Sequence, residues 1–240
     1  MSDPVILALE ASGEPASVAL RLRDGRVLER FSSGEKQSAF LLPAADALLS
    51  EAGLGLRDIG LIAVGRGPGG FTGVRFALSV AQGLAYGLGI PTVGISTLAA
   101  LALDAAHRAR ASEGEAVLAL LDARMGELYG GLLRIGGAGL IEAISEEFLA
   151  APAAIPRRFE TSSFRIVAGA AIESDPGLFA WLQGKGVRSM AQARPHAARI
   201  AELGLAAWRL GRAGSPASLA PAYLRDKVAL TEAERRSEQT

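Results

Sequence analysis

A glycine-rich segment between two apolar stretches constrains the fold of this chain more than any other feature. The segment reads GRGPGGFTG over residues 65–73. The apolar run 61–64 precedes it, and residues 74–88 carry apolar side chains at helical spacing. This order predicts a strand, a tight loop and a helix. A loop that opens a helix is also a place for a phosphate group, because the first backbone N–H groups of a helix have no partner within the helix.

The glycine-rich segment fits two phosphate-binding patterns only in part. In the P-loop pattern, G-x-x-x-x-G-K-[ST], Gly65, Gly70 and Thr72 fall in place. The lysine of that pattern is missing, because Phe71 occupies its position. In the dinucleotide pattern, G-x-G-x-x-G, Gly65, Gly67 and Gly70 fit, but no carboxylate follows about twenty residues later. The simpler interpretation is a tight turn that lets the helix pack closely against the sheet.

The helix predicted for residues 72–88 has apolar or small side chains on more than one face. Besides the stripe that any core-facing helix needs, it carries a second row that includes Phe76, Val80 and Gly83. The helix predicted for residues 37–52 is just as broadly apolar. A helix that is apolar on two faces is buried on two faces, so we expect a second layer of this chain or another protein to cover this surface.

Composition and charge argue against several classes of function. The chain has 240 residues, half of them hydrophobic, with 25 basic and 25 acidic side chains and no cysteine. A net charge of zero argues against extensive nucleic-acid or membrane binding, and the lack of cysteine excludes disulfides and thiolate metal sites. With no signal peptide and no apolar run of membrane-spanning length, we expect a soluble cytoplasmic protein. His107 and His196 are the only histidines and form no H-E-x-x-H pair, so the sequence argues against a metallopeptidase and predicts no metal site.

The predicted elements repeat in two halves. Each half begins with a strand and a hairpin, at 5–10, 17–23 and 26–31 in the first half and at 116–121 and 127–135 in the second. A turn is expected at 122–126 and a polar break at 111–115. The further elements that we expect are the strand 92–95, the helix 97–110, a helical patch at 145–151, the strand 165–170, the helix 196–210 and the extended stretch 221–225.

This order predicts a duplicated α/β fold of the actin-like ATPase group, to which sugar kinases and heat-shock proteins belong. We expect an N-terminal subdomain over 1–110, a C-terminal subdomain over 111–228 and a polar tail over 229–240.

Likeness to the actin-like group implies that the hairpin after the first strand of each half grips phosphate, usually through Asp with Gly and Thr or Ser close behind. Both hairpins are incomplete here, because the first offers Glu10-Ala11-Ser12-Gly13 and the second Asp122-Ala123-Arg124. We therefore expect little or no ATP hydrolysis by the isolated chain. The alternative is a weak ATPase or phosphotransferase. Either way, the residues of these vestigial phosphate loops are Glu10, Ser12, Gly67, Gly69, Gly70, Thr72 and Asp122.

Several short motifs in fixed order resemble the bacterial TsaB family. They are residues 65–75, 81–85, 94–98, 122–127 and 223–225. The resemblance is dense over 5–103 and thinner afterwards. Family members commonly have Asp-Thr after the first strand and a histidine where this chain has Gln37, so Glu10-Ala11 and Gln37 depart from the family pattern.

The resemblance implies a non-catalytic subunit of the complex that makes threonylcarbamoyladenosine in tRNA. In the family, the metal-dependent paralogue TsaD does the catalytic work, TsaE is the ATPase, and tRNA is reached through the complex. TsaB binds TsaD through two N-terminal helices, which map here to about 37–52 and 72–88. The implied interface residues are Gln37, Leu41, Leu42, Ala45, Leu48, Arg75, Phe76, Ser79, Val80 and Gly83.

The resemblance implies no cofactor, catalytic residue or metal of the chain's own. It leaves open ATP or ADP at the complex interface. A homodimer of the chain alone is also open, since an apolar helix pair can bind its own copy.

Overall fold

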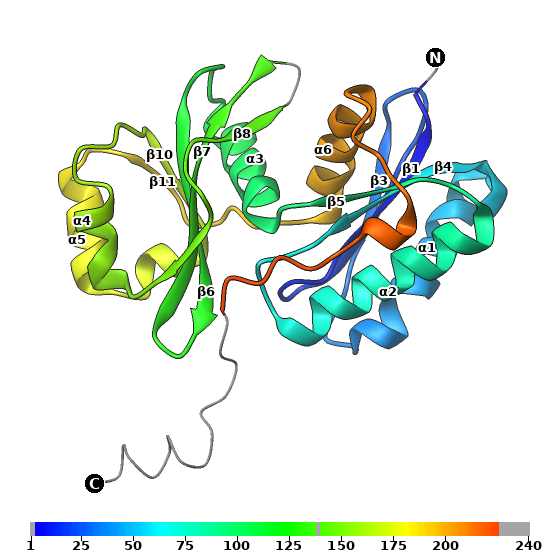
Figure 1. The fold of residues 1–240 in the computed structure, drawn as a ribbon, viewed down its shortest axis with the longest axis horizontal. Helices are drawn as coiled ribbons and strands as arrows, with labels where there is room; N and C mark the ends of the chain where they lie inside the picture. The colour runs from blue at the N-terminus through cyan, green and yellow to red at the C-terminus, as the bar shows by residue number, and fades with distance from the viewer. Residues whose placement is uncertain (1–2, 138–139, 226–240) are drawn as a thin grey trace, which may run out of the picture.

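Two β-sheets, each flanked by helices, form the fold (Figure 1). The computed structural model describes residues 3–137 and 140–225, so the predicted polar tail 229–240 lies outside the described residues. β1, β2 and β3 form an antiparallel meander, and β4 and β5 run parallel to β1. The order of this first sheet is β3-β2-β1-β4-β5, with β1 (Val5–Glu10), β2 (Ser17–Arg21), β3 (Val27–Phe31), β4 (Ile59–Gly65) and β5 (Thr92–Ile95).

The second sheet repeats this topology. Its order is β8-β7-β6-β10-β11, with β6 (Ala116–Arg124), β7 (Glu127–Ile135), β8 (Ile141–Ala143), β10 (Ile166–Ala168) and β11 (Arg188–Met190), and β9 (Phe148–Ala150) also pairs with β7. As in the first sheet, the first three strands are antiparallel and the last two run parallel to the first. The repeated order confirms the predicted fold class, a duplicated actin-like α/β architecture.

Helices cover both faces of each sheet. α1 (Gln37–Ala52) and α2 (Phe71–Leu88) pack on one face of the first sheet, and α6 (Ala197–Arg209) packs on the other. α3 (Thr97–Ala109) packs on one face of the second sheet, and α4 (Ile155–Arg158) and α5 (Pro176–Gly184) pack on the other. Short 3-10 helices lie at Leu56–Asp58, Pro152–Ala154, Ala170–Glu173 and Pro216–Ser218. Within residues 3–137 and 140–225, no helix combines the length and the apolar character needed to cross a membrane.

Two helices lie between the sheets, and each packs on the sheet of the other half. α3 follows the first sheet in the chain but packs on the second, whereas α6 follows the second sheet but packs on the first, and the two helices contact each other (Figure 1). In β1, Leu7 and Leu9 face α1 and α2, while Ile6 and Ala8 face α6. A strand that is covered on both faces needs apolar side chains at successive positions, which explains the continuous apolar run in β1.

Two of the predicted elements are corrected by the structure. The helical patch predicted at 145–151 is wrong, because Phe148–Ala150 forms strand β9. The Phe148 ring packs over Gly130 of β7, where an added Cβ would come within 2.3 Å of the ring, so this pairing depends on a glycine. The turn predicted at 122–126 is shorter, because β6 continues through an irregularity to Arg124. The helices predicted at 37–52, 72–88, 97–110 and 196–210 are confirmed.

Candidate functional site

A cavity of about 560 Å³ lies between the two halves. The turn after β1, the start of α2, the end of β6 and the segments 193–195 and 221–225 all contribute to its lining. The duplicated topology thus places the two corresponding hairpins at one cavity. It brings together five of the predicted phosphate-loop residues, namely Glu10, Ser12, Gly69, Gly70 and Asp122, whereas Gly67 and Thr72 do not line it in the described part of the chain.

The glycines of segment 65–73 serve close packing within the chain. An added Cβ at Gly69 would lie 2.5 Å from the Ser12 side chain, and one at Gly73 would lie 1.9 Å from the carbonyl oxygen of Ala11. The backbone N–H of Gly70 donates to the carbonyl oxygen of Ser12 at 2.6 Å. The loop and the first turn of α2 therefore press against the turn after β1, which supports the tight-turn interpretation.

Glu10 is buried, and its carboxylate points into the protein. One oxygen accepts the N–H of Ser12 at 2.6 Å and the other accepts the Thr97 hydroxyl at 3.4 Å. An added Cβ at Gly65 would lie 2.1 Å from the Glu10 carboxylate, so that glycine makes room for it. Burial raises the pKa of Glu10, and the hydrogen bonds from Ser12 and Thr97 offset this only in part. The Glu10 carboxylate therefore serves to hold the turn after β1. It differs from a carboxylate that reaches into the cavity to hold a phosphate-bound metal ion.

We expect Glu10→Gln to stabilise the isolated chain at pH about 7, by about 1 kcal/mol or a Tm increase of about 3 °C. The amide keeps an acceptor for Ser12 and removes a charge that burial makes unfavourable. Because the pKa of Glu10 is raised, this penalty is present above that pKa and disappears as the pH falls below about 4. Thermal unfolding at pH about 7 and at pH about 4 measures the change in Tm. Glu14→Gln is the control, because Glu14 is exposed. A lower Tm at neutral pH would show that the fold needs the charged form.

Asp122 forms the corresponding contact in the second half. Its Oδ1 accepts the backbone N–H of Arg124 at 2.7 Å, and its Oδ2 lies 3.3 Å from the guanidinium of the same residue. Glu10 accepts the N–H of the residue two positions on in the same way. Both predicted phosphate-loop acids thus hold their own hairpins, and this shared arrangement follows from the duplication.

The segment 221–225 crosses from α2 to the hairpin of the second half. Arg75 Nε donates to the Tyr223 hydroxyl at 2.8 Å, and the Arg75 guanidinium lies 3.5 Å from the centre of the Phe71 ring. Arg225 pairs with Glu127 at 2.5 Å. In the sequence, Tyr223 and Arg225 stand out only as part of a short motif. Their structural role depends on contacts with partners far away in the sequence. Tyr223 is 148 positions from Arg75, and Arg225 is 98 positions from Glu127, so no local pattern reveals either contact.

The residues implied as a partner interface fall into two groups. Leu42, Arg75, Ser79 and Gly83 are exposed, and Gln37, Phe76 and Val80 are half-buried. Leu41, Ala45 and Leu48 are instead buried in this chain's own core under α1, so the structure does not expose these three implied interface residues to a partner. Their spacing places them on the side of α1 that faces the sheet.

The outer face of α2 carries two glycines that the chain itself does not require. Gly83 and Gly87 are exposed. Apart from the chain neighbours and the backbone of α2 itself, an added Cβ at either would have no atom of the described residues within 4 Å. Glycine inside a helix costs about 1 kcal/mol relative to alanine. Close packing within the chain, which explains the glycines of the loop, therefore does not explain these two.

The two histidines lie on α3 and immediately before α6. His107 Nε2 lies 3.1 Å from Glu202 at the surface, and His196 is buried between Glu29 and Asp104. Across residues 3–137 and 140–225, no group of three or more His, Cys, Asp or Glu side chains is arranged to hold a metal ion.

Comparisons with known proteins point to proteins of threonylcarbamoyladenosine biosynthesis in tRNA. The family model described as TsaD, tRNA N6-adenosine threonylcarbamoyltransferase, matches residues 33–164. The chain is 41% identical over 129 residues to a tRNA threonylcarbamoyladenosine biosynthesis protein TsaB from Haemophilus influenzae, and 43% identical over 125 residues to the one from Escherichia coli. These matches cover 54% and 52% of this chain, and 53% and 52% of the relatives, so the chain spans about half the length of the curated relatives it matches.

Solved structures extend the likeness over the whole fold. A protein from Pseudomonas aeruginosa described as uncharacterized with similarity to peptidase YEAZ superimposes with a TM-score of 0.80 at 35% identity. A structure described as YeaZ from the same organism also has a TM-score of 0.80, at 34% identity. Each match covers 92% of this chain and 100% of the solved chain.

Proposed function

Because this chain belongs to the TsaB family, we propose that it acts in the biosynthesis of threonylcarbamoyladenosine in tRNA. We propose further that it is a non-catalytic subunit, which binds and activates a TsaD-like catalytic paralogue through α1 and α2. The observation that carries the second proposal is the outer face of these helices, where Leu42 is 48% exposed and Gly83 has open space beside it.

The match to the transferase family model supports a paralogous partner. That match covers residues 33–164 and thus includes both α1 and α2. A catalytic paralogue of this family would carry a corresponding helix pair, and two such pairs can pack as a four-helix bundle. Small residues at Ser79, Gly83 and Gly87 would let the backbone of a partner helix approach closely. Helix packing distance depends on the side chains at the contact.

The remaining parts of the proposal follow the family. A TsaE-like ATPase would join the complex, and tRNA would be reached through the complex. Binding of ATP or ADP at the interface with the paralogue, and a homodimer of the chain alone through the same helices, stay open. The chain would work in the cytoplasm. The alternative, a weak ATPase of the actin-like group, is favoured by the cavity that joins both hairpins. It predicts ATP turnover by the isolated chain with magnesium, whereas we expect little or none because Glu10 and Asp122 bind their own hairpins.

Gly83→Ala tests the helix face, because it should change stability and binding in opposite directions. We expect the isolated variant to be more stable by up to about 1 kcal/mol, since alanine favours the helix and nothing in the described chain blocks its Cβ. We expect its affinity for the purified catalytic paralogue to fall about tenfold, because the Cβ would keep the partner helix away. Urea unfolding and titration calorimetry measure the two effects.

Gly184→Ala is the matched control, because Gly184 is also exposed in a helix with open space beside it, but on α5 of the second half. It should keep full affinity for the paralogue. If Gly83→Ala bound as tightly as the parent chain, this face of α2 would not be the interface. If the parent chain and paralogue eluted separately in light-scattering chromatography, with and without ATP, the subunit proposal itself would fail.

A further inference from the structure

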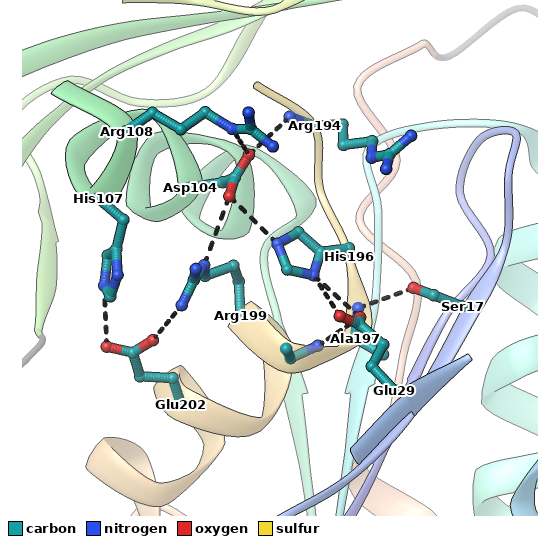
Figure 2. Close-up of polar contacts among 11 residues, drawn as sticks. Ser17, Glu29, Asp104, His107, Arg108, Arg194, His196, Ala197, Arg199 and Glu202 are labelled. Atoms are coloured by element: carbon teal, nitrogen blue, oxygen red, sulfur yellow. Dashed lines mark hydrogen bonds and ion pairs between the residues drawn. The ribbon is translucent and has the colours of Figure 1, made fainter. Parts of the chain in front are cut away.

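A buried polar cluster joins α3 to the start of α6, where the chain passes between the two halves (Figure 2). The chain crosses from the first sheet to the second through β5 and α3, and it returns from β11 through residues 191–196 to α6. A change in the angle between the halves would bend the chain at such crossings, which are the usual positions of hinges. Contacts that join these crossings to each other therefore control that angle.

Asp104 on α3 is the centre of the cluster, and it is only 2% exposed. Its Oδ2 accepts hydrogen bonds from Arg108 Nε at 2.7 Å and from the backbone N–H of Arg194 at 3.2 Å. Its Oδ1 lies 3.2 Å from His196 Nε2 and 3.5 Å from Arg199 Nε. Arg194 and His196 belong to the crossing that leads into α6, and Arg199 lies in the first turn of α6 itself, so one carboxylate holds the crossing and the start of the helix against α3.

His196 connects this carboxylate to the first sheet. Its Nδ1 lies 2.9 and 3.0 Å from the two carboxylate oxygens of Glu29 in β3. Because both ring nitrogens face carboxylates, the arrangement favours the doubly protonated, positively charged ring, in which both nitrogens donate. Glu29 also accepts the N–H of Ala198 at 2.9 Å, and the Ser17 hydroxyl oxygen accepts the N–H of Ala197 at 2.8 Å. The first turn of α6 is thus fixed to β2 and β3 as well as to α3.

The oppositely charged groups of the cluster stabilise each other's charged forms. Burial by itself lowers the pKa of His196, but its hydrogen bonds with Asp104 and Glu29 outweigh burial and raise that pKa above its ordinary value. Burial raises the pKa of Asp104, but hydrogen bonds from His196 and Arg108 outweigh burial and hold that pKa well below its ordinary value.

We propose that this cluster is a hinge lock, which holds the two halves at one angle and the cavity between them at one width. Opening the hinge would separate Asp104 from His196 and leave buried charge without its partner, which is strongly unfavourable. Residues 193–195 form part of the cavity wall, so the contacts that hold the crossing also hold that wall. The chain then behaves as a rigid body that presents α1 and α2 in a fixed orientation.

The lock can be tested directly by measuring the distance between the two halves. Pulsed electron paramagnetic resonance gives this distance on a chain that carries one spin label in each half. Since the chain has no cysteine, Arg57→Cys in the first half and Thr161→Cys in the second supply two exposed labelling sites without further changes. We expect one narrow distance distribution for the labelled parent chain at neutral pH. Asp104→Asn should add a second, longer distance population, because the neutral amide no longer holds the imidazolium and the two arginines.

His107→Gln is the matched control, since His107 also pairs with a carboxylate, Glu202, but at the surface. It should keep the parent distribution. If folded Asp104→Asn kept the single narrow distribution, the lock would be overturned. If Asp104→Asn did not fold, the pH dependence of the parent chain decides the test. As the pH rises through the raised pKa of His196, the ring loses its positive charge and the second population should grow, whereas the distribution of His196→Gln should not change with pH. A single narrow distribution in the parent chain throughout this titration would overturn the lock as well.

Discussion

Gly73→Ala is expected to destabilise the isolated chain by about 3 kcal/mol, or to lower its Tm by about 8 °C. Gly73 lies in the first turn of α2, and an added Cβ would come within 1.9 Å of the carbonyl oxygen of Ala11 and 3.1 Å of its carbonyl carbon. The obstacle is backbone, which cannot rotate away as a flexible side chain could. The start of α2 would have to move off the turn after β1, and the hydrogen bond from Gly70 to Ser12 would lengthen with it.

Gly87→Ala in the same helix is the control for this change. Both substitutions replace glycine by alanine in α2, but Gly87 has no atom of the described chain within 4 Å of an added Cβ. We therefore expect Gly87→Ala to be neutral or to stabilise by up to about 1 kcal/mol. Urea unfolding followed by circular dichroism measures both variants. Equal stability of Gly73→Ala and the parent chain would mean that the start of α2 does not pack against the turn after β1.

This contrast shows what the glycine pattern could and could not predict. The sequence contains glycines both in segment 65–73 and at 83 and 87, and spacing alone treats them alike. The loop glycines at 69 and 73 have neighbours closer than 3 Å to an added Cβ, whereas the later pair has open space. Which glycine is needed for packing depends on what lies opposite it in three dimensions. Such neighbours are distant in the sequence, so a local pattern does not identify them.

The order of elements was predictable because it depends on local signals. Hairpin turns, helical periodicity and continuous apolar runs gave the meander and the helices of the first half. The short strand β9 was missed because Phe148–Ala150 has no pattern of its own and exists only by pairing with β7. The lock was missed for the same reason, since His196 and Glu29 are 167 residues apart and meet through the exchange of α3 and α6 between the sheets.

The orientation of α1 was only half predictable from the sequence. The sequence of α1 indicated correctly that its apolar side chains cover more of the helix surface than the face that packs on the core. It did not show which of two adjacent leucines faces the core, and the structure divides them clearly: Leu41 is 0% exposed and Leu42 is 48% exposed. The rotation of a helix about its own axis is set by packing, and a helix that is apolar all round gives little information about that rotation.

Because Leu41 is buried and Leu42 is exposed, replacing each leucine by glutamate should have a large but different effect. Leu42→Glu should leave the isolated chain folded, because its side chain is half exposed and leucine and glutamate have similar helix propensities. It should weaken binding to the catalytic paralogue about 100-fold, since a charge would be buried in an apolar interface without a partner. Titration calorimetry gives the affinity, and thermal unfolding confirms the fold.

Leu41→Glu should instead unfold the chain, because it places a charge among the buried side chains that α1 shares with β1 and β2. Leu56→Glu is the control for surface charge, since Leu56 is 47% exposed, as much as Leu42, but lies in the short helix before β4. That variant should fold and bind normally. Binding of Leu42→Glu at parent affinity would exclude this position from the interface. Loss of binding in Leu56→Glu as well would show that any added negative charge is enough to weaken the complex, because the effect would then be independent of position on the surface.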